Sequence, residues 1–278
     1  MKLKYILPVI LVISAFSCED LERPNTDQFV VEAFITAGLP IDDIKIKKTA
    51  LLSVDSLPDV PITSAQVRVL STESDVLLSY DPDAGKYFAD DFALSIESFE
   101  QYRIEIDVEG TSAFAMTTVP EPPTGLTLSD TELIVPQLRL TLALRDQIET
   151  LFEEERITLS WDPIPGRSFF VVIETQEEQL DPILPQEIPE ESLELLSSFR
   201  FISEPSEATS FEIIAIALET YGRHVAKVFT VNEEYVDLFN SATQDSRDLN
   251  EPPSNMSNAL GIFTAFAVDS LEFEVSRN

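Results

Sequence analysis

The sequence predicts a mainly β protein: two β-sandwich domains in tandem, of the immunoglobulin or fibronectin type III kind, with one or two short helices in the second domain. Many segments alternate apolar and polar side chains with a period of two, which is typical of half-buried antiparallel strands. Turns rich in proline, glycine and aspartate separate these segments. Hydrophobic residues make up 44% of the 278 residues, which is enough to bury a core.

The charge balance is strongly acidic. Asp and Glu total 50 against 18 Lys and Arg, which gives a formal net charge of −32. The acidic residues are spread along the chain, which indicates a solvated surface rather than an acidic tail. Such a surface repels the phosphates of nucleic acids and of anionic membranes, so we expect no nucleic-acid partner.

Residues 1–17 have the pattern of a cleavable signal peptide. Lys2 and Lys4 form a short basic region, and Tyr5–Phe16 supply an apolar core. This core is shorter than the ~20 apolar residues that a membrane-spanning helix needs. The segment is therefore predicted to direct export and to be removed.

The end of this segment resembles a bacterial lipobox. In Ile13–Cys18 the small residue Ser17 directly precedes Cys18, which is the only cysteine of the chain. The resemblance implies that a lipid is attached to the Cys18 thiol, that cleavage follows Ser17, and that the new amine is acylated. Several acyl chains anchor a protein stably in a membrane. The alternative is an ordinary secretory signal in which Cys18 is incidental.

Residues 18–27 are predicted to be a tether, because they are polar and contain a proline. Glu19, Asp20 and Glu22 follow the cysteine and resemble the export signal of some Bacteroidetes surface lipoproteins. We therefore expect an outer-membrane protein, lipid-anchored at the cell surface. The periplasmic face is the alternative.

The first domain is predicted over residues 28–119. Its clearest strand is Gln101–Gly110, where Tyr102 and Ile104 face one side and Arg103 and Glu105 the other. Such alternation indicates a half-buried antiparallel strand. Further strands are predicted at Phe29–Thr36, Ile44–Ala50 and Ala65–Val69.

Asp81–Gly85 predicts a turn before the short segment Lys86–Phe88. Asp81, Asp83 and the nearby Asp90 and Asp91 also suggest a calcium loop. An EF-hand requires a bidentate Glu at a fixed position and flanking helices, and neither is present here. A hairpin turn is therefore favoured, and we expect no metal or cofactor.

Prolines at residues 120–123 predict the linker, and the second domain is predicted over residues 124–278 as a fibronectin type III-like β domain with helical insertions. Its segment Ile157–Trp161 alternates and precedes a proline-marked turn. This resembles a fibronectin type III strand that ends on a core tryptophan, so Trp161 is expected to be buried. The later strands are predicted at Phe169–Thr175, Phe199–Ser203, Phe211–Leu218, Val225–Val231 and Leu271–Val275.

Two segments of the second domain are predicted to be helical. Leu144, Ile148, Leu151 and Phe152 share one helical face. Asn232 is expected to cap a second helix that begins with two glutamates, whose charges complement a helix N-terminus. The segment between them at residues 179–197 is rich in Pro and Glu and predicts a long loop with a short helix.

The residues available for catalysis are few. The only histidine, His224, lies beside Arg223 in a predicted strand, and we expect it on the surface at a hairpin turn. A Ser-His-Asp triad or a His-rich metal site therefore has too few candidates, and with 7 glycines the chain has no glycine-rich phosphate loop. We predict that the protein is not an enzyme. A carboxylate-based hydrolase is the least favoured alternative, because acids are abundant.

The C-terminal region carries a family resemblance. The segment Glu251–Phe266, with its Pro-Pro-Ser-Asn and Gly-Ile-Phe motifs, resembles the ending of a Bacteroidetes lipoprotein family known as domain of unknown function 4249. Val30–Thr36, Gly85–Phe88, Tyr102–Ile106 and Thr118–Pro120 match it in the same order. The resemblance implies a lipoprotein often encoded beside a TonB-dependent outer-membrane transporter, with an accessory or ligand-binding role. A structural or adhesive surface module is the alternative.

Overall fold

The structure is a computed structural model that describes residues 29–48, 60–90, 93–136, 156–183, 200–215, 218–242 and 253–277. The described residues form three sheets and pack into β-sandwiches, which confirms the mainly β prediction. The helix predicted around residues 144–152 lies outside the described ranges, as does most of the loop predicted at residues 179–197.

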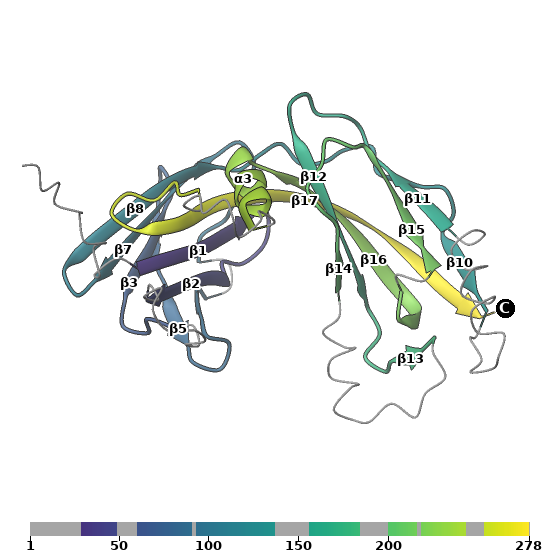
Figure 1. Cartoon of the computed structure of the whole chain (residues 1–278), viewed down its shortest axis with the longest axis horizontal. Helices are drawn as coiled ribbons and strands as arrows, with labels where there is room; N and C mark the ends of the chain where they lie inside the picture. The colour runs from purple at the N-terminus through teal and green to yellow at the C-terminus, as the bar shows by residue number, and fades with distance from the viewer. Residues whose placement is uncertain are drawn as a thin grey trace, which may run out of the picture.

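A ten-stranded sheet runs through the whole molecule (Figure 1). In order across this sheet, the strands are β14 (Arg200–Ile202), β12 (Ser168–Thr175), β16 (Thr220–Val231), β17 (Leu260–Arg277), β1 (Phe29–Thr36), β2 (Asp43–Lys48), β6 (Lys86–Phe88) and β5 (Ser79–Asp81). The short strands β10 (Glu132–Val135) and β13 (Asp181–Pro182) join it by pairing with β17 and β16.

A four-stranded sheet covers one half of the long sheet. Its strands in order are β4 (Asp75–Leu77), β3 (Gln66–Leu70), β7 (Gln101–Val108) and β8 (Thr111–Thr118). The first hydrophobic core lies between the two sheets and includes Ile35, Ile44, Ile104 and Phe263. The predicted strand Gln101–Gly110 ends at Val108, because the next two residues have positive φ angles and make the turn to β8.

A three-stranded sheet covers the other half, with the order β15 (Ser210–Ile214), β11 (Arg156–Ser160) and β9 (Thr127–Leu128). The second core lies beneath it and contains Trp161, Phe169, Val228 and Phe273. Trp161 is buried as predicted, and its ring centroid lies 5.6 Å from that of Phe169.

Strand β17 connects the two halves. It has 18 residues, pairs in parallel with β1 over Leu260–Phe266 and in antiparallel with β16 over Phe266–Val275. Phe263, Ala265 and Ala267 therefore contribute to the first core, while Phe273 and Val275 contribute to the second. Figure 1 shows β17 as a single curved strand that crosses both sandwiches.

Two tyrosines, Tyr87 and Tyr102, are buried in the first core, and the hydroxyl group of each is hydrogen-bonded. Tyr87 Oη donates to the Ile62 carbonyl (2.8 Å) and accepts from the Ala65 amide (3.0 Å). Tyr102 Oη donates to the Ser95 carbonyl (2.9 Å). Burial raises the pKa of both tyrosines. Each hydroxyl fixes a loop to the sheet without leaving a buried polar atom unpaired.

Helix α3 (Glu233–Ala242) begins where the sequence predicts. Asn232 precedes it, but the Asn232 side chain does not act as the expected cap. Its Nδ2 donates to the Thr118 carbonyl (2.9 Å) and to Thr117 Oγ1 (3.2 Å), both on β8. The backbone carbonyl of Asn232 accepts from the Tyr235 amide instead. Asn232 therefore connects β16 to the other half of the molecule.

Candidate functional site

The residues predicted to carry the lipid anchor and the export signal, Cys18, Glu19, Asp20 and Glu22, lie outside the described residues. Their roles remain predictions. No helix within the described parts of the chain is long and apolar enough to cross a membrane.

His224 is not on the surface, so that prediction is wrong. The side chain lies within β16 and is 3% exposed. Its ring stacks on Phe273, and Nδ1 lies 3.0 Å from the Gly222 carbonyl while Nε2 lies 3.5 Å from Thr220 Oγ1. Burial lowers the pKa of His224, because the charged imidazolium loses its hydration. Hydrogen-bonding partners for both ring nitrogens let this polar side chain enter the core.

The Asp81–Gly85 segment forms the predicted turn. Asp81 Oδ1 accepts hydrogen bonds from the amides of Asp83 (2.8 Å) and Ala84 (3.2 Å), and Gly85 has a φ of +68°. This is an Asx turn, in which the carboxylate satisfies backbone donors. Within the described residues, no group of three or more His, Cys, Asp or Glu side chains is arranged to hold a metal ion.

The described part of the C-terminal motif, residues 253–266, makes contacts that hold β17 in place. Asn255 pairs with the Phe263 backbone, its Nδ2 donating to the carbonyl (2.8 Å) and its Oδ1 accepting from the amide (2.9 Å). Asn258 adopts a φ of +64° and donates to the Ser112 carbonyl (3.1 Å). Gly261 lies directly against Val31 of β1. These residues position β17 between the halves of the molecule.

The outer face of the four-stranded sheet is the candidate functional surface. We name it the outer face and define it by the outward side chains of β3, β4, β7 and β8. It exposes three large apolar side chains: Leu77 (60% exposed), Met116 (47%) and Phe114 (36%). Strand β8 buries Ala113 and Ala115 and presents its larger residues to solvent. Burying alanine while exposing phenylalanine and methionine favours a binding role.

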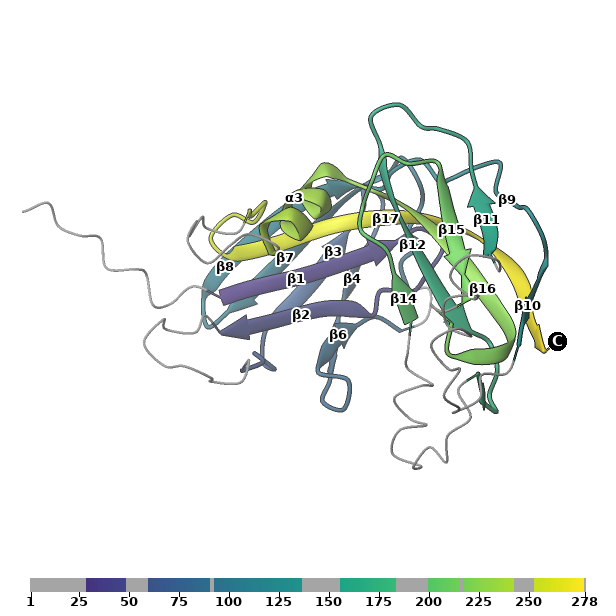
Figure 2. The same ribbon diagram turned by 45° about the vertical axis from the view of Figure 1, so that its right-hand side comes forward.

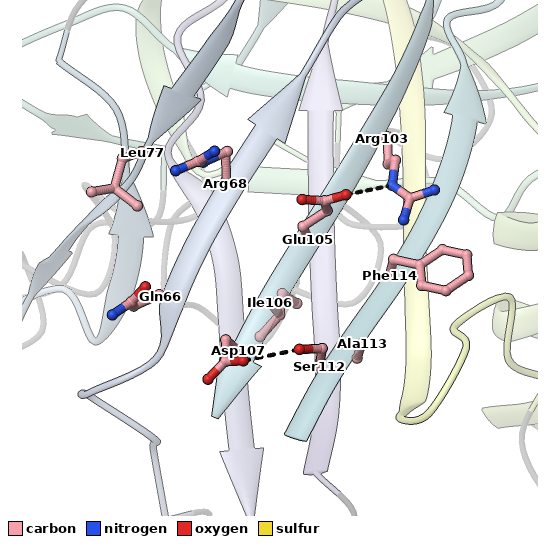
Figure 3. Close-up of a pocket in the computed structure, with 10 residues that line it drawn as sticks. All are labelled: Gln66, Arg68, Leu77, Arg103, Glu105, Ile106, Asp107, Ser112, Ala113 and Phe114. Carbon is pink, nitrogen blue, oxygen red and sulfur yellow. Dashed lines mark hydrogen bonds and ion pairs between the residues drawn. The ribbon is translucent and has the colours of Figure 1, made fainter. Parts of the chain in front are cut away.

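Charged side chains surround these apolar groups. The Arg103 guanidinium lies over the Phe114 ring, 4.2 Å from its centroid, and its Nε is 2.8 Å from Glu105 Oε1 (Figure 3). Arg68 lies 3.4 Å from Asp75. Exposed ion pairs of this kind contribute little to stability, about 0–1 kcal/mol each.

The outer face contains a shallow hollow of about 330 Å³. Arg68, Leu77 and Phe114 lie around it, and Figure 3 shows them coming from three different strands. Asp107 and Ser112 form a hydrogen bond (2.9 Å) at one end. An aromatic ring, a cation above it and flanking hydrogen-bond groups are typical of protein-binding surfaces.

The outer edge of β8 is largely occupied by the chain itself. Phe114 exchanges backbone hydrogen bonds with Ser257, while the Ser112 carbonyl accepts from Asn258 and the Thr118 carbonyl from Asn232. An edge strand with its backbone groups satisfied is a poor template for an added strand. Binding at this sheet therefore uses side chains on its face rather than the edge of β8.

A second hollow, of about 410 Å³, lies at the C-terminal end of β17. There the Arg277 guanidinium pairs with Asp181 and stacks over the Tyr221 ring, 4.7 Å from its centroid. The Arg277 guanidinium is therefore already paired, whereas the outer face keeps large apolar side chains exposed. The outer face is therefore the better candidate.

The sequence alone did not find this surface. The strand β8 was not predicted, because its inward residues are small and give a weak alternation signal. The comparison with known families is consistent with the resemblance described above. The model of the family described as a domain of unknown function, DUF4249, matches residues 17–272. No curated protein sequence matches the chain.

Proposed function

The chain belongs to the DUF4249 family, and we propose that it is a lipid-anchored protein of the cell envelope. In this role it serves as an accessory or ligand-binding component of an outer-membrane uptake system. In this proposal the outer face holds a polypeptide of the uptake system or its ligand. The proposed partner is a TonB-dependent β-barrel transporter.

The anchor is supported by the N-terminal sequence. A short apolar segment after two lysines ends at Ser17, and the only cysteine of the chain follows at position 18. Lipid attachment requires a cysteine thiol at this position, directly after the cleavage site. The partner class is supported by the family resemblance in sequence, which implies a transporter encoded nearby.

One observation carries the binding role. Phe114 and Met116 of β8 are exposed on the same sheet face as Leu77 of β4, with β3 and β7 between them, while alanines fill the core beneath β8. Burying apolar surface stabilises a protein or complex by about 25 cal/mol for each Å² removed from water. Exposed apolar side chains do not contribute this free energy. A partner that covers the outer face recovers this free energy.

Labelling and fractionation test the anchor. Cells that express the chain with a C-terminal affinity tag are grown with labelled palmitate, and the wild type is expected to take up label and to fractionate with the outer membrane. The variant Cys18→Ser is expected to lose the label. Absence of label in the wild type would refute the anchor.

Purification from solubilised outer membranes tests the partner. The tagged wild type is expected to retain a β-barrel transporter through a wash at physiological salt. Recovery of the wild type without any envelope protein, from cells grown under conditions that induce the transporter, would contradict an accessory role.

A structural surface module is the second candidate, and strand β17 favours it. Its 18 residues pair with both β1 and β16, so one strand holds both sandwiches in a fixed arrangement. Such a body suits a stalk or spacer. Protease treatment of intact cells that fails to release the protein would weaken this candidate.

A further inference from the structure

Phe99 is the most exposed of the large apolar side chains in the described parts of the chain, at 67%. Its backbone is also in an unusual conformation, with a φ of +71°. The Glu100 amide donates to the Glu97 carbonyl (3.3 Å), so residues 97–100 form a turn in which Phe99 is the third residue. A positive φ at this position is typical of type II turns, where glycine normally supplies it. A phenylalanine is therefore strained here.

The strain at Phe99 is not offset by packing of its ring. Most of the side chain is in solvent, and none of the hydrophobic cores formed by the described residues includes it. A strained backbone persists only where the surrounding structure fixes it, and such positions concentrate at functional sites. The combination of strain and exposure therefore favours a binding role for the ring.

Hydrogen bonds fix the turn that carries Phe99 to the first sandwich. The Phe99 amide donates to the Val119 carbonyl (2.9 Å), and the Val119 amide donates to the Glu100 carbonyl (3.0 Å). Tyr102 Oη, which is anchored in the first core, accepts from the Glu97 amide (2.8 Å). The backbone is therefore already ordered, which reduces the conformational entropy that binding would cost.

The loop that follows β1 lies beside this turn. The Gly38 amide donates to the Ile96 carbonyl (2.9 Å), and the next residue, Leu39, is 47% exposed. Figure 2 shows β1 pointing toward the second sandwich, so the loop after it lies at the end of the first sandwich where the two halves meet. We define the junction patch as the three segments that these hydrogen bonds join, residues 36–42, 94–101 and 117–121.

The junction patch is acidic. It contains no lysine or arginine, and it has four exposed acids, Asp42, Glu97, Glu100 and Glu121. Four acids and no base give the patch a formal charge of −4. Two charged groups lie next to it: Thr117 Oγ1 donates to Glu234 (3.3 Å), and Arg167 donates to Asn232 (3.4 Å), which in turn contacts Thr118. These two neighbouring charges cancel, so the surroundings of Phe99 stay negative.

We propose that Phe99 is an anchor residue that enters an apolar pocket on a protein partner, and that lysines and arginines surround this pocket. A rigid aromatic side chain is typical of the residues that dominate protein interfaces. The four acids attract a basic protein surface and repel an anionic membrane, so a protein is the favoured occupant. Binding here uses side chains outside the outer face and needs no lipid anchor.

Site-specific photo-cross-linking tests the proposal. The photoreactive residue p-benzoylphenylalanine is incorporated at position 99 of the full-length tagged chain, in cells that keep the native envelope. Position 134 is the control, because Ile134 is an exposed apolar residue of the other half (43%). After irradiation, the products are purified through the tag, and the cross-linked segment is identified by mass spectrometry.

The expected product at position 99 is a protein segment with more Lys and Arg than Asp and Glu, formed in at least about tenfold higher yield than at position 134. The variant Glu97→Gln/Glu100→Gln is expected to lower this yield at least about threefold, as is ~0.5 M salt. The matched variant Glu204→Gln/Glu207→Gln neutralises two exposed acids of the other half and is expected to leave the yield unchanged.

The unfolding temperature distinguishes a binding residue from a structural one. Phe99→Gly removes the strain and is expected to raise the unfolding temperature by about 2 °C, because glycine adopts a positive φ without a steric penalty. Phe99→Ser keeps the strain and removes an exposed ring, so it is expected to change this temperature by less than about 1 °C. Both variants are expected to retain the cross-linked partner at least about tenfold less well than the wild type.

Three results would overturn the proposal. The first is a yield at position 99 no higher than at position 134. The second is a cross-link to lipid, or to a protein segment without an excess of basic residues. The third is a lower unfolding temperature for both Phe99→Gly and Phe99→Ser, which would show that the ring supports the fold.

Discussion

Gly261 of β17 lies against the backbone of Val31 in β1. A Cβ atom at position 261 would come 2.0 Å from the Val31 carbonyl oxygen, and Gly261 has a φ of +102°. The two residues are partners in the parallel pairing of β1 and β17. This close approach is possible only without a side chain, which explains why glycine occupies this position in the C-terminal motif.

The substitution Gly261→Ala is therefore expected to destabilise the fold by about 3 kcal/mol or more, since both the φ angle and the contact are unfavourable. Urea unfolding followed by fluorescence measures this. Gly110→Ala is the matched control, because Gly110 has a φ of +89° and no atom within 4 Å of the added Cβ. It is expected to cost about 1 kcal/mol. Equal costs would show that the contact with Val31 is unimportant.

Asn232 is expected to be intolerant of a nearly isosteric change. Asn232→Asp replaces the Nδ2 donor by an oxygen that faces the carbonyls of Thr118 and Ala265, close to Glu234. The expected cost is about 3 kcal/mol at neutral pH. The control Asn258→Asp changes an exposed amide and is expected to cost less than about 1 kcal/mol. Thermal unfolding of both variants checks this, and equal losses would contradict it.

The stability of the protein is expected to depend on pH through His224. Burial lowers the pKa of the folded His224 below its ordinary value, so below about pH 6.5 the unfolded chain binds a proton that the folded chain does not. Stability therefore falls as pH decreases through this range, by at most about 1.4 kcal/mol per pH unit.

Urea unfolding of the wild type and of His224→Gln between about pH 8 and 5 isolates this effect, since all other titrating groups are shared. The wild type is expected to lose more stability than the variant as the pH falls. Parallel curves would show that His224 does not contribute.

The exposed apolar side chains of the outer face are expected to contribute to partner binding but little to the stability of the fold. Phe114→Ser/Met116→Ser is expected to change the free energy of unfolding by no more than about 1 kcal/mol, because both side chains are already exposed. Recovery of an envelope partner is expected to drop at least about tenfold. Ile134→Ser/Ile202→Ser removes two exposed apolar side chains elsewhere and is expected to leave recovery unchanged. Equal recovery by all three proteins would exclude the outer face.

Strands with one buried face and one solvent-exposed face were predictable from the sequence. Phe29–Thr36 was predicted with the bounds that β1 has, because its alternate residues are buried and half-buried. The Asp81–Gly85 turn was also predictable, since local hydrogen bonding and the φ preference of Gly85 decide it. These features depend on residues that are close together in the chain.

Strand β17 and the burial of His224 were not predictable in the same way. Residues 262–267 are buried on both faces, so they show no alternation, and only Leu271–Val275 was predicted as a strand. The His224 side chain is polar, yet it is buried because Gly222 and Thr220 supply hydrogen-bonding partners and Phe273 stacks on its ring. These contacts are not visible in the sequence. The outer face was missed because β8 buries alanines.

The sequence by itself determined the β class, the family, and which segments alternate, because these depend on residue type and on spacing within a segment. The tertiary structure alone decided that β17 joins both sandwiches, that Asn232 connects them, and that Leu77, Phe114 and Met116 are exposed on the outer face. Each of these depends on which distant strands pair, and in what register, and a period of two does not specify a partner.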